Sequence, residues 1–541
     1  MAGNRKKRSS YLVLSQGCGE NCSHMSNEVM TYTMSMGVNG VKGYPVHVEV
    51  FGMGGIPGME IIGLPDASVR ESRDRVNAAI INSGFELVAR RITVNLAPAD
   101  MKKEGPSFDL PIAVGVMIVM DQLHPDDRFE AEDTVFFGEL SLDGRIRPVN
   151  GALPMAISAK ECGIRNVVLP EENAKEAACI EGLNIYPAST LKQVIRHIEG
   201  TECIRPQKQI SYDDLSGERI LVSDMSQIRG QHAARRALEV AAAGGHNMLM
   251  IGVPGSGKTM LARCLPGILP PMTFEESLET TRIHSICGRL APGSGLMVVR
   301  PFSSPHHSAS VISLIGGGPN AKPGEVSLAH NGVLFLDELP EFSRAALEAL
   351  RQPLEDGVVS VSRIRHQAQY QSAFMLIAAM NPCPCGYYGS DSHPCRCTPT
   401  EIRRYLDRVS GPLLDRIDLQ IEVDAVPVQE IRQNLQAESS SVIAERVAAA
   451  RALQQDRYRK ESFHSNSQLK NSSIPKYCPV SREGEILLNA AVESMRLSMR
   501  AYSRILKTAR TIADLDHEEI ISSAHIAEAV QYRELDQKYW R

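Results

Sequence analysis

The sequence lacks an apolar run long enough to cross a lipid bilayer. The stretch Leu110–Met120 is too short and contains Pro111 and Gly115. The basic residues 5–8 are followed only by the short apolar stretch Tyr11–Leu14, which is too little for a signal peptide. These absences predict a cytoplasmic protein without membrane contact. Its twelve cysteines are then expected to be reduced, and buried, reactive or metal-bound rather than paired in disulfides.

The chain also lacks an excess of positive charge. It has 58 Lys and Arg against 63 Asp and Glu, a net charge of -5. This excludes a generally basic nucleic-acid binder, so any contact with nucleic acid must come from local basic patches. Internal repeats and long low-complexity tracts are absent as well. The 541 residues, 43% of them hydrophobic, predict a globular protein with two or three domains.

Changes in composition and periodicity divide the chain into five parts. They are a disordered extension (1–30), an α/β block (31–203), a polar linker (204–217), a second α/β block (218–423) and a helical region (424–541). In the first block, the alternation of Val46, Val48 and Val50 is typical of a half-buried strand. Apolar patterns also predict one strand over Val135–Leu140 and one helix over Ala491–Ile512.

A glycine-rich motif in the second block predicts a nucleotide site. Its residues are Gly252, Val253, Pro254, Gly255, Ser256, Gly257, Lys258 and Thr259, which fit G-x-x-x-x-G-K-[ST]. The apolar strand Met248–Ile251 precedes the motif and the helix Met260–Leu265 follows it. A glycine loop that arose by chance would have no reason to lie between a strand and a helix. Backbone N–H groups and the helix N-terminus favour phosphate there. Lys258 is expected to reach the β- and γ-phosphates of ATP, and Thr259 to bind Mg²⁺.

An acidic pair at the end of a second apolar strand completes this prediction. Val333–Leu336 is typical of a buried parallel strand and is followed by Asp337 and Glu338. Asp337 is expected to hold Mg²⁺ through water, and Glu338 to polarise the attacking water. Alone, such a pair could be ordinary surface charge. A third strand, Phe374–Met380, ends at Asn381, whose side chain can orient the water opposite the γ-phosphate.

Together these motifs resemble AAA+ ATPases of the branch that contains magnesium-chelatase motor subunits and MCM helicases. Leu413–Asp418 resembles the segment of that branch whose arginine, here Arg416, enters the ATP site of a neighbouring subunit. Ser498–Ala501 resembles the start of a lid helix that carries a second sensor arginine, here Arg500, with Arg504 as the weaker candidate. The resemblance implies a ring of six subunits. An arginine that acts across subunits requires such an oligomer.

Two further segments match elements that grip DNA in helicases of this branch. The insertion Thr273–Val326 contains His306 and His307, and Gly357–Gln371 alternates like a hairpin with Arg363 and Arg365 near its tip. The two arginines could neutralise phosphates without reading sequence. A charged hairpin can equally be an ordinary surface edge. Both interpretations stay open.

Four cysteines follow Asn381 in one loop. They are Cys383, Cys385, Cys395 and Cys397. Four thiols with Pro and Gly turns can form a Zn²⁺ site in a reducing compartment. The C-x-C spacing is tighter than the common C-x₂-C, so a zinc site and a metal-free loop both stay open.

The first α/β block resembles the proteolytic domain of Lon protease. Three segments carry the likeness: Gly105–Ser107, Gly138–Ile146 and Gly163–Pro170. In Lon the serine of the first segment is the nucleophile and a lysine activates it. Here Ser107 has Pro154 in the place of that lysine, and Lys160 lies on the wrong side of the predicted helix. A serine without its base is a weak nucleophile, so a non-proteolytic module is expected.

The whole arrangement resembles the ComM/YifB family, from about Met34 to Gln531. Gly63–Val69 and Ala329–Pro340 are the most specific segments. The resemblance implies an α/β fold with an AAA+ core around a parallel sheet, a Lon-like α+β domain and a helical lid. It also implies a hexameric DNA helicase for branch migration during recombination in natural transformation. Expected cofactors are ATP and Mg²⁺, and expected partners are single-stranded, duplex or branched DNA, further copies of the chain and recombination proteins.

Two other classes of function compete with this one. A magnesium-chelatase-type motor would remodel a protein partner, and we count the Lon-like domain against it. An ATP-dependent peptidase would need the lysine that Pro154 replaces. The choice of DNA as substrate rests on the resemblance alone.

Overall fold

The computed structural model describes residues 28–216, 223–318, 321–363, 366–390, 393–425 and 437–540. The chain forms two compact units, Met1–Gly217 with Ser277–Met297, and Glu218–Glu276 with Val298–Arg541. None of the described helices is both long and apolar enough to cross a membrane. Most of the predicted extension lies outside the described residues. Its last two residues are wrongly assigned, however, because Val29 and Met30 pair with Gly52 and Phe51 in a strand.

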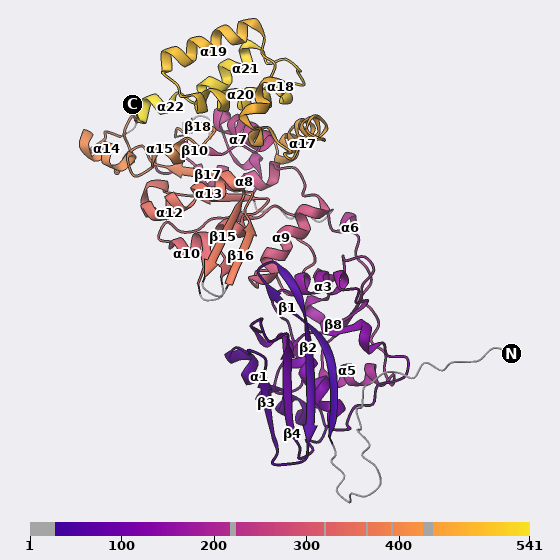
Figure 1. The fold of residues 1–541 in the computed structure, drawn as a ribbon. Helices are drawn as coiled ribbons and strands as arrows, with labels where there is room; N and C mark the ends of the chain where they lie inside the picture. Colours follow the sequence, from indigo (N-terminus) through magenta and orange to yellow (C-terminus); the bar gives the residue numbers. More distant parts are fainter. Residues whose placement is uncertain are drawn as a thin grey trace, which may run out of the picture. The chain divides into compact units, whose positions relative to one another are not determined.

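The first unit is built on a seven-stranded mixed sheet. The strand order is β3-β4-β2-β1-β5-β8-β9, in which β1–β2 and β2–β4 are antiparallel and the other pairs are parallel. The strands are β1 (Val29–Asn39), β2 (Lys42–Met53), β3 (Gly58–Ile62), β4 (Arg91–Ala97), β5 (Thr134–Phe136), β8 (Asn166–Pro170) and β9 (Asn184–Ala188). The helices are α1 (Ala67–Asn82), α2 (Asp109–Val119), α3 (Ala152–Glu161), α4 (Ala174–Ala177), α5 (Leu191–Ile198) and α6 (Tyr212–Ser216). The almost entirely apolar α2 packs on β1 and β2 and contributes many residues to the core. The strands β1, β2, β3 and β4 of this sheet are labelled in Figure 1.

The single strand predicted over Val135–Leu140 is wrong. The structure has β5, which ends at Phe136, and a separate short strand β6 (Glu139–Leu140) that pairs with β7 (Ile146–Arg147). The chain turns at Gly138, whose N–H donates to the carbonyl of Ser107 over 2.9 Å. A Cβ at Gly138 would lie 2.8 Å from the side chain of Ile146, so the tight approach depends on glycine.

Two stretches that the sequence placed outside the first α/β block belong to the first unit. In the predicted linker, Ile204 is buried in the core, and the N–H of Gln207 donates to a carbonyl of β9 over 2.7 Å. Residues 277–297, from the predicted insertion, also belong there and include most of α9 (Phe274–Ile286). The hydroxyl of Ser285 donates to the buried Glu176 over 2.8 Å, and burial raises the pKa of that carboxyl.

The second unit contains a five-stranded sheet in which every pair is parallel, as predicted. The strand order is β11-β14-β17-β10-β18. The strands are β11 (Phe302–Ser303), β14 (Val333–Leu336), β17 (Met375–Met380), β10 (Met248–Ile251) and β18 (Leu419–Glu422), and a hairpin of β15 (Val358–Arg363) and β16 (His366–Gln371) stands apart from this sheet. The helices around them are α7 (His232–Gly244), α8 (Lys258–Ile268), α10 (Val311–Ile315), α11 (Glu325–Leu328), α12 (Arg344–Ala349), α13 (Arg351–Asp356), α14 (Pro399–Leu406) and α15 (Gly411–Leu414). The carboxyl ends of β10, β14 and β17 lie at one edge because these strands are parallel neighbours.

The helical region at the end of the chain forms a lid on this core. Its helices are α17 (Ser440–Arg457), α18 (Ile474–Tyr477), α19 (Arg482–Met495), α20 (Met499–Leu515), α21 (Ser523–Gln531) and α22 (Leu535–Trp540). The single helix predicted over Ala491–Ile512 is wrong. Arg496 adopts a left-handed conformation with φ 47° and ends α19, and Ser498 caps the start of α20 by accepting from the N–H of Ala501. Both α17 and α20 pack on α7.

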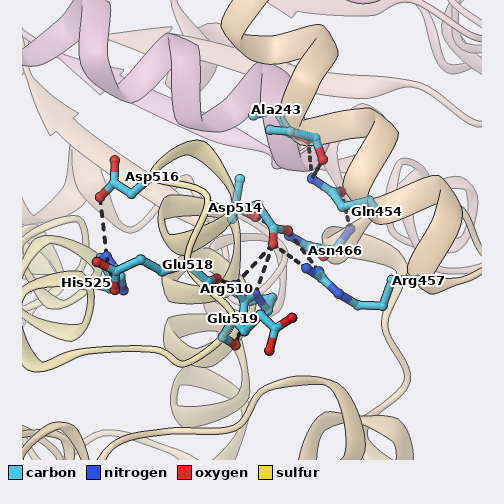
Figure 2. A network of polar contacts seen from close by, with 12 residues as sticks. Ala243, Gln454, Arg457, Asn466, Arg510, Asp514, Asp516, Glu518, Glu519 and His525 are labelled. Carbon is cyan, nitrogen blue, oxygen red and sulfur yellow. Dashed lines mark hydrogen bonds and ion pairs between the residues drawn. The ribbon is translucent and has the colours of Figure 1, made fainter.

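A buried polar network holds the lid together and ties it to the core (Figure 2). The fully buried carboxylate of Asp514 accepts from Arg457 over 2.9 Å, from Arg510 over 3.2 Å and from Asn466 over 2.8 Å. On the core side, the amide of Gln454 donates to the carbonyl of Ala243 in α7 over 3.0 Å. A buried charge this well paired stabilises one arrangement of the helices and is costly to remove.

We expect Asp514→Ala to lower the free energy of unfolding of the second unit by about 3–5 kcal/mol, because the buried guanidinium of Arg510 and the partly buried one of Arg457 lose their counter-charge. Urea denaturation followed by circular dichroism measures this change. The matched control is Asp516→Ala, since Asp516 is half exposed and pairs with His525 over 3.3 Å. That control should cost about 1 kcal/mol or less. Equal midpoints for the two variants would contradict the stabilising role of Asp514.

Candidate ATP site

The glycine-rich loop lies between β10 and α8, in the context that the sequence predicts. Gly255 and Gly257 have φ angles of 79° and 92°, a conformation that other residues adopt only with strain. At Gly252 a Cβ would collide with the carbonyl oxygen of Val423. Gly257 caps the start of α8, which runs for 11 residues from Lys258. A loop of this shape at a helix N-terminus can bind phosphate through backbone N–H groups.

Lys258 joins this loop to the end of β17. Its ammonium group donates to the carbonyls of Gly252 over 2.8 Å and Val253 over 2.9 Å, and to the side-chain oxygen of Asn381 over 3.3 Å. The lysine side chain is buried, and burial lowers its pKa, which the carboxylate of Asp337 partly opposes. The structure thus brings together Lys258 and Asn381, which are 123 residues apart in the sequence.

Thr259 and Asp337 meet on the other side of the loop. The Thr259 hydroxyl donates to the Asp337 carboxylate over 2.8 Å, and the second oxygen of Asp337 accepts from the N–H of Glu338 over 3.0 Å. A hydroxyl and a carboxylate at the start of a phosphate-binding helix are oxygen ligands of the kind that Mg²⁺ prefers. The donor set therefore fits the predicted magnesium ion.

Glu338 has a neighbour that the sequence did not suggest. Its backbone is left-handed, with φ 52°, and its side chain is 53% exposed. One carboxylate oxygen lies 3.0 Å from Nδ1 of His307, whose ring in turn lies against that of His306 with centroids 4.1 Å apart. Both histidines belong to the insertion that is predicted to grip DNA. In the structure His307 contacts the acidic pair of the ATP site, a contact that spacing along an insertion does not reveal.

Arg416 does not contact the loop residues of its own chain in any hydrogen bond between described residues. Its guanidinium is buried, donates to the carbonyl of Pro412 over 2.6 Å and forms an ion pair with Glu355. The backbone of Arg416 is held as well, since the side chain of Asn247 donates to the Arg416 carbonyl over 2.9 Å. The role of Arg416 in a neighbouring subunit stays a prediction.

The two arginines considered for the second sensor differ in their surroundings. Arg500, near the start of α20, is 69% exposed and lies 3.3 Å from Asp415. Arg504, one turn later, forms an ion pair with the buried Asp418. Burial alone would raise the pKa of Asp418, but Arg504 and His246 outweigh burial and hold this pKa well below its usual range. Arg504 is therefore bound inside the chain, and Arg500 is the freer group.

The predicted hairpin is present as β15 and β16, with Arg363 paired to His366 in its last register position. Arg365 lies outside the described residues, and the side chain of Arg363 is not described. The prediction that both arginines contact DNA stays a prediction.

The four cysteines come together in space. Ligand atoms of Cys383, Cys385, Cys395 and Cys397 all lie within 4.8 Å of one another. The Sγ atom of Cys383 is 3.3 Å from that of Cys385 and 3.7 Å from that of Cys395. Four sulfurs around a tetrahedral zinc ion with bonds of about 2.3 Å would be separated by about 3.8 Å. The cluster therefore fits zinc.

This cysteine cluster is supported against the phosphate-binding loop. The N–H of Tyr388 donates to Cys383 over 3.3 Å, and the backbone N–H of Arg396 lowers the pKa of the Cys385 thiol to about 6. A Cβ at Gly386 would lie 2.6 Å from the ring of Pro254, so the two loops are in close contact. The spacing of the cysteines in the sequence did not decide between a zinc site and a metal-free loop. The fold brings the four sulfur atoms close enough to bind one ion.

Within the first unit, Ser107 has no lysine as a hydrogen-bond partner among the described residues. Ser107 is buried in the short helix η1 (Pro106–Phe108), and Pro154 is buried in α3. Lys160 is exposed, and the buried Lys103 donates instead to the carbonyls of Pro98 and Met101. The absence of proteolytic activity stays a prediction.

The parallel sheet, the glycine-rich loop, the acidic strand end and the helical lid define an AAA+ ATPase of the magnesium-chelatase type. Three family profiles match: "Magnesium chelatase, subunit ChlI" over residues 224–431, "Subunit ChlI of Mg-chelatase" over 48–173, and "Magnesium chelatase, subunit ChlI C-terminal" over 437–533. The second match covers the Lon-like block. The Lon-like block was counted against a chelatase-type motor. This match removes that argument, because a chelatase-subunit profile covers most of the block.

Full-length relatives identify the family. The chain is 44% identical to the YifB protein of Salmonella typhimurium, covering 92% of this chain and 96% of the relative. It is also 44% identical to the competence protein ComM of Haemophilus influenzae, covering 91% and 95%. Lon protease of Rhizobium meliloti is 30% identical over 168 residues, which covers 30% of this chain and 20% of that protein. The chain belongs to the YifB/ComM family, and this membership supports the use of ATP and Mg²⁺.

Proposed function

We propose that this protein is an ATP-driven hexameric DNA motor, a helicase that promotes branch migration during recombination in natural transformation. The observation that carries the proposal is the assembled site in which Lys258 meets Asn381 and Thr259 meets Asp337. The competence protein of Haemophilus influenzae, related over nearly its whole length, supports the choice of DNA as substrate.

The arrangement of side chains suggests how ATP is hydrolysed. The loop N–H groups and Lys258 bind the phosphates, and Asn381, bonded to Lys258, orients the attacking water. The carboxylate of Glu338 first separates from His307 and then accepts a proton from that water. Mg²⁺ held at Thr259 and Asp337 would offset the charge on the phosphates. An arginine from a neighbouring copy, Arg416, stabilises the charge of the transition state.

An ATPase assay with single-stranded, duplex and branched DNA tests the proposal. We expect branched DNA to stimulate turnover, and the purified protein to migrate a branch only with ATP. Arg363→Ala with Arg365→Ala should abolish migration, because the hairpin loses its contacts to phosphate. The control pair is Arg459→Ala with Lys460→Ala, two exposed cations in the turn that follows α17. If the hairpin variant migrates branches at the wild-type rate, the segment around His306 and His307 becomes the better candidate for the grip.

A second candidate function is a chelatase-type motor that remodels a protein partner. The three matching family profiles favour it, since all carry the name of a chelatase subunit. The two functions differ in a simple measurement. A motor that acts on proteins should hydrolyse ATP at the same rate with and without any of the three DNA substrates.

We also propose that the cysteine cluster holds a structural zinc ion. Purified protein should contain about one zinc ion per chain by metal analysis, because four thiolates in this arrangement match a closed zinc site. Cys395→Ser with Cys397→Ser should lose the metal. The control, Cys203→Ser, removes an exposed thiol elsewhere and should retain it. Wild-type protein that neither contains zinc nor takes it up after reduction would contradict the assignment.

A further inference from the structure

A wide groove lies in the second unit, and one of its walls follows the acidic pair of the ATP site directly in the chain. Its walls are the short helix η5 (Leu339–Glu341), the start of α12 and the face of α14, and its volume is about 1020 Å³. The lining residues are Pro340, Glu341, Phe342, Arg344, Pro399, Thr400, Arg403, Arg404, Asp407 and Arg408. Pockets for small molecules are mostly apolar and rarely exceed about 1,000 Å³. This groove lies at the upper end of that range and is lined mainly by charged residues.

The charges of the groove do not balance. Four arginines face two carboxylates, which leaves a surplus of two positive charges in a chain whose net charge is -5. Arg408 pairs with Glu341 over 2.9 Å, and Arg403 lies 4.0 Å from Asp407. Arg344 and Arg404 are exposed and form no close ion pair within the part of the chain that the structure describes. Each acts only at longer range on a carboxylate of its own helix, since Arg344 helps to lower the pKa of Glu348 and Arg404 that of Glu401.

The helix dipoles of the groove walls account for only part of this surplus of positive charge. Arginines in the last turn of α14 offset the negative end of its dipole, which suits Arg403 and Arg404. Arg344 lies on the opposite wall, at the start of α12, where the dipole disfavours a positive charge. A planar guanidinium on each wall instead suits phosphate groups, which arginine binds with two parallel hydrogen bonds.

The groove is also connected to the catalytic end of β14. Its η5 wall begins directly after Glu338, and Arg408 donates to the carbonyl of Pro340 in that wall over 3.3 Å. The hydrogen bond from Arg408 thus links the arginine wall of the groove to the segment that follows Glu338. Such a connection would let binding in the groove influence the position of the carboxylate that contacts His307.

We propose that this arginine groove binds the phosphate backbone of a nucleic-acid strand next to Glu338. The proposal rests on the proposed function as a DNA motor and adds a contact surface separate from the hairpin. Two arginines that neutralise phosphates of a single strand contribute about 1.4 to the slope of log affinity against log salt concentration. Because phosphate contacts carry no sequence information, the contribution should be the same for any sequence.

Fluorescence anisotropy with a labelled single-stranded oligonucleotide, at several salt concentrations, tests this. The test variant is Arg344→Ala with Arg404→Ala, which leaves the internally paired Arg403 and Arg408 in place. We expect its salt slope to fall by about 1.4 relative to wild type. Arg344→Lys with Arg404→Lys should restore most of the slope, since it keeps both charges. The control pair Arg459→Ala with Lys460→Ala should leave the slope unchanged.

The outcomes separate the groove from the wider proposal. Wild-type protein that binds no oligonucleotide would refute the DNA motor itself. Wild-type binding with an unchanged slope in the Arg344 and Arg404 variant would refute the groove alone. If that variant keeps its slope but loses its oligomeric state in sedimentation, the arginines instead contact the acidic surface of a second copy, which also overturns the proposal.

Discussion

Glu338→Gln should bind ATP about as well as the wild type and hydrolyse it at about a hundredth of the wild-type rate or less. The substitution keeps the shape of the side chain and removes the group that accepts a proton from water, a contribution of about 10²- to 10⁴-fold. Fluorescent-nucleotide binding and phosphate release measure the two steps separately. The control Glu483→Gln removes an exposed carboxylate on α19 and should change neither.

Lys258→Ala should fail at the earlier step. Its ammonium group contacts the loop carbonyls and Asn381, so its loss removes both the charge for the phosphates and the link to the end of β17. We expect weaker nucleotide binding as well as lost turnover.

Normal turnover in Glu338→Gln would remove Glu338 as the residue that activates water. Normal binding and turnover in Lys258→Ala would place the phosphates elsewhere.

Arg416→Ala should lower ATP turnover by about 10³- to 10⁵-fold, the effect of losing an arginine finger. If the residue acts on a neighbouring copy, mixing inactive Arg416→Ala with inactive Lys258→Ala protein should restore activity, because some interfaces then combine an intact loop with an intact arginine. Phosphate release across mixing ratios measures this. The absence of rescue at every ratio, in assemblies shown to exchange subunits, would contradict a role across subunits.

The ion pair between Arg416 and Glu355 adds a refinement to this experiment. Glu355→Gln removes the carboxylate that holds the guanidinium within its own chain. Its turnover should therefore equal or exceed that of the wild type. A loss as large as that of Arg416→Ala would show that the pair supports the fold rather than competes with the finger.

Much of the second unit could be predicted because its signals are local. The strand Met248–Ile251, the glycine loop and the start of α8 follow from consecutive residues, since backbone conformation and hydrophobic pattern act over a few positions. The family resemblance then predicted the parallel sheet and the helical lid. The errors within single elements lie where one residue breaks a pattern. Gly138 divides Val135–Leu140, and the left-handed Arg496 divides Ala491–Ile512.

By itself, the sequence determined the class of protein through its family resemblance, the glycine-rich loop, the acidic strand end and the replacement of the Lon lysine by Pro154. Only the tertiary structure decided that His307 contacts Glu338, that Arg504 is bound to Asp418 and that four sulfurs converge. The physical reason is the range of the interactions. Turns and strands are specified by neighbouring residues, whereas a side-chain contact across many residues depends on how separate elements pack, which no spacing along the chain records.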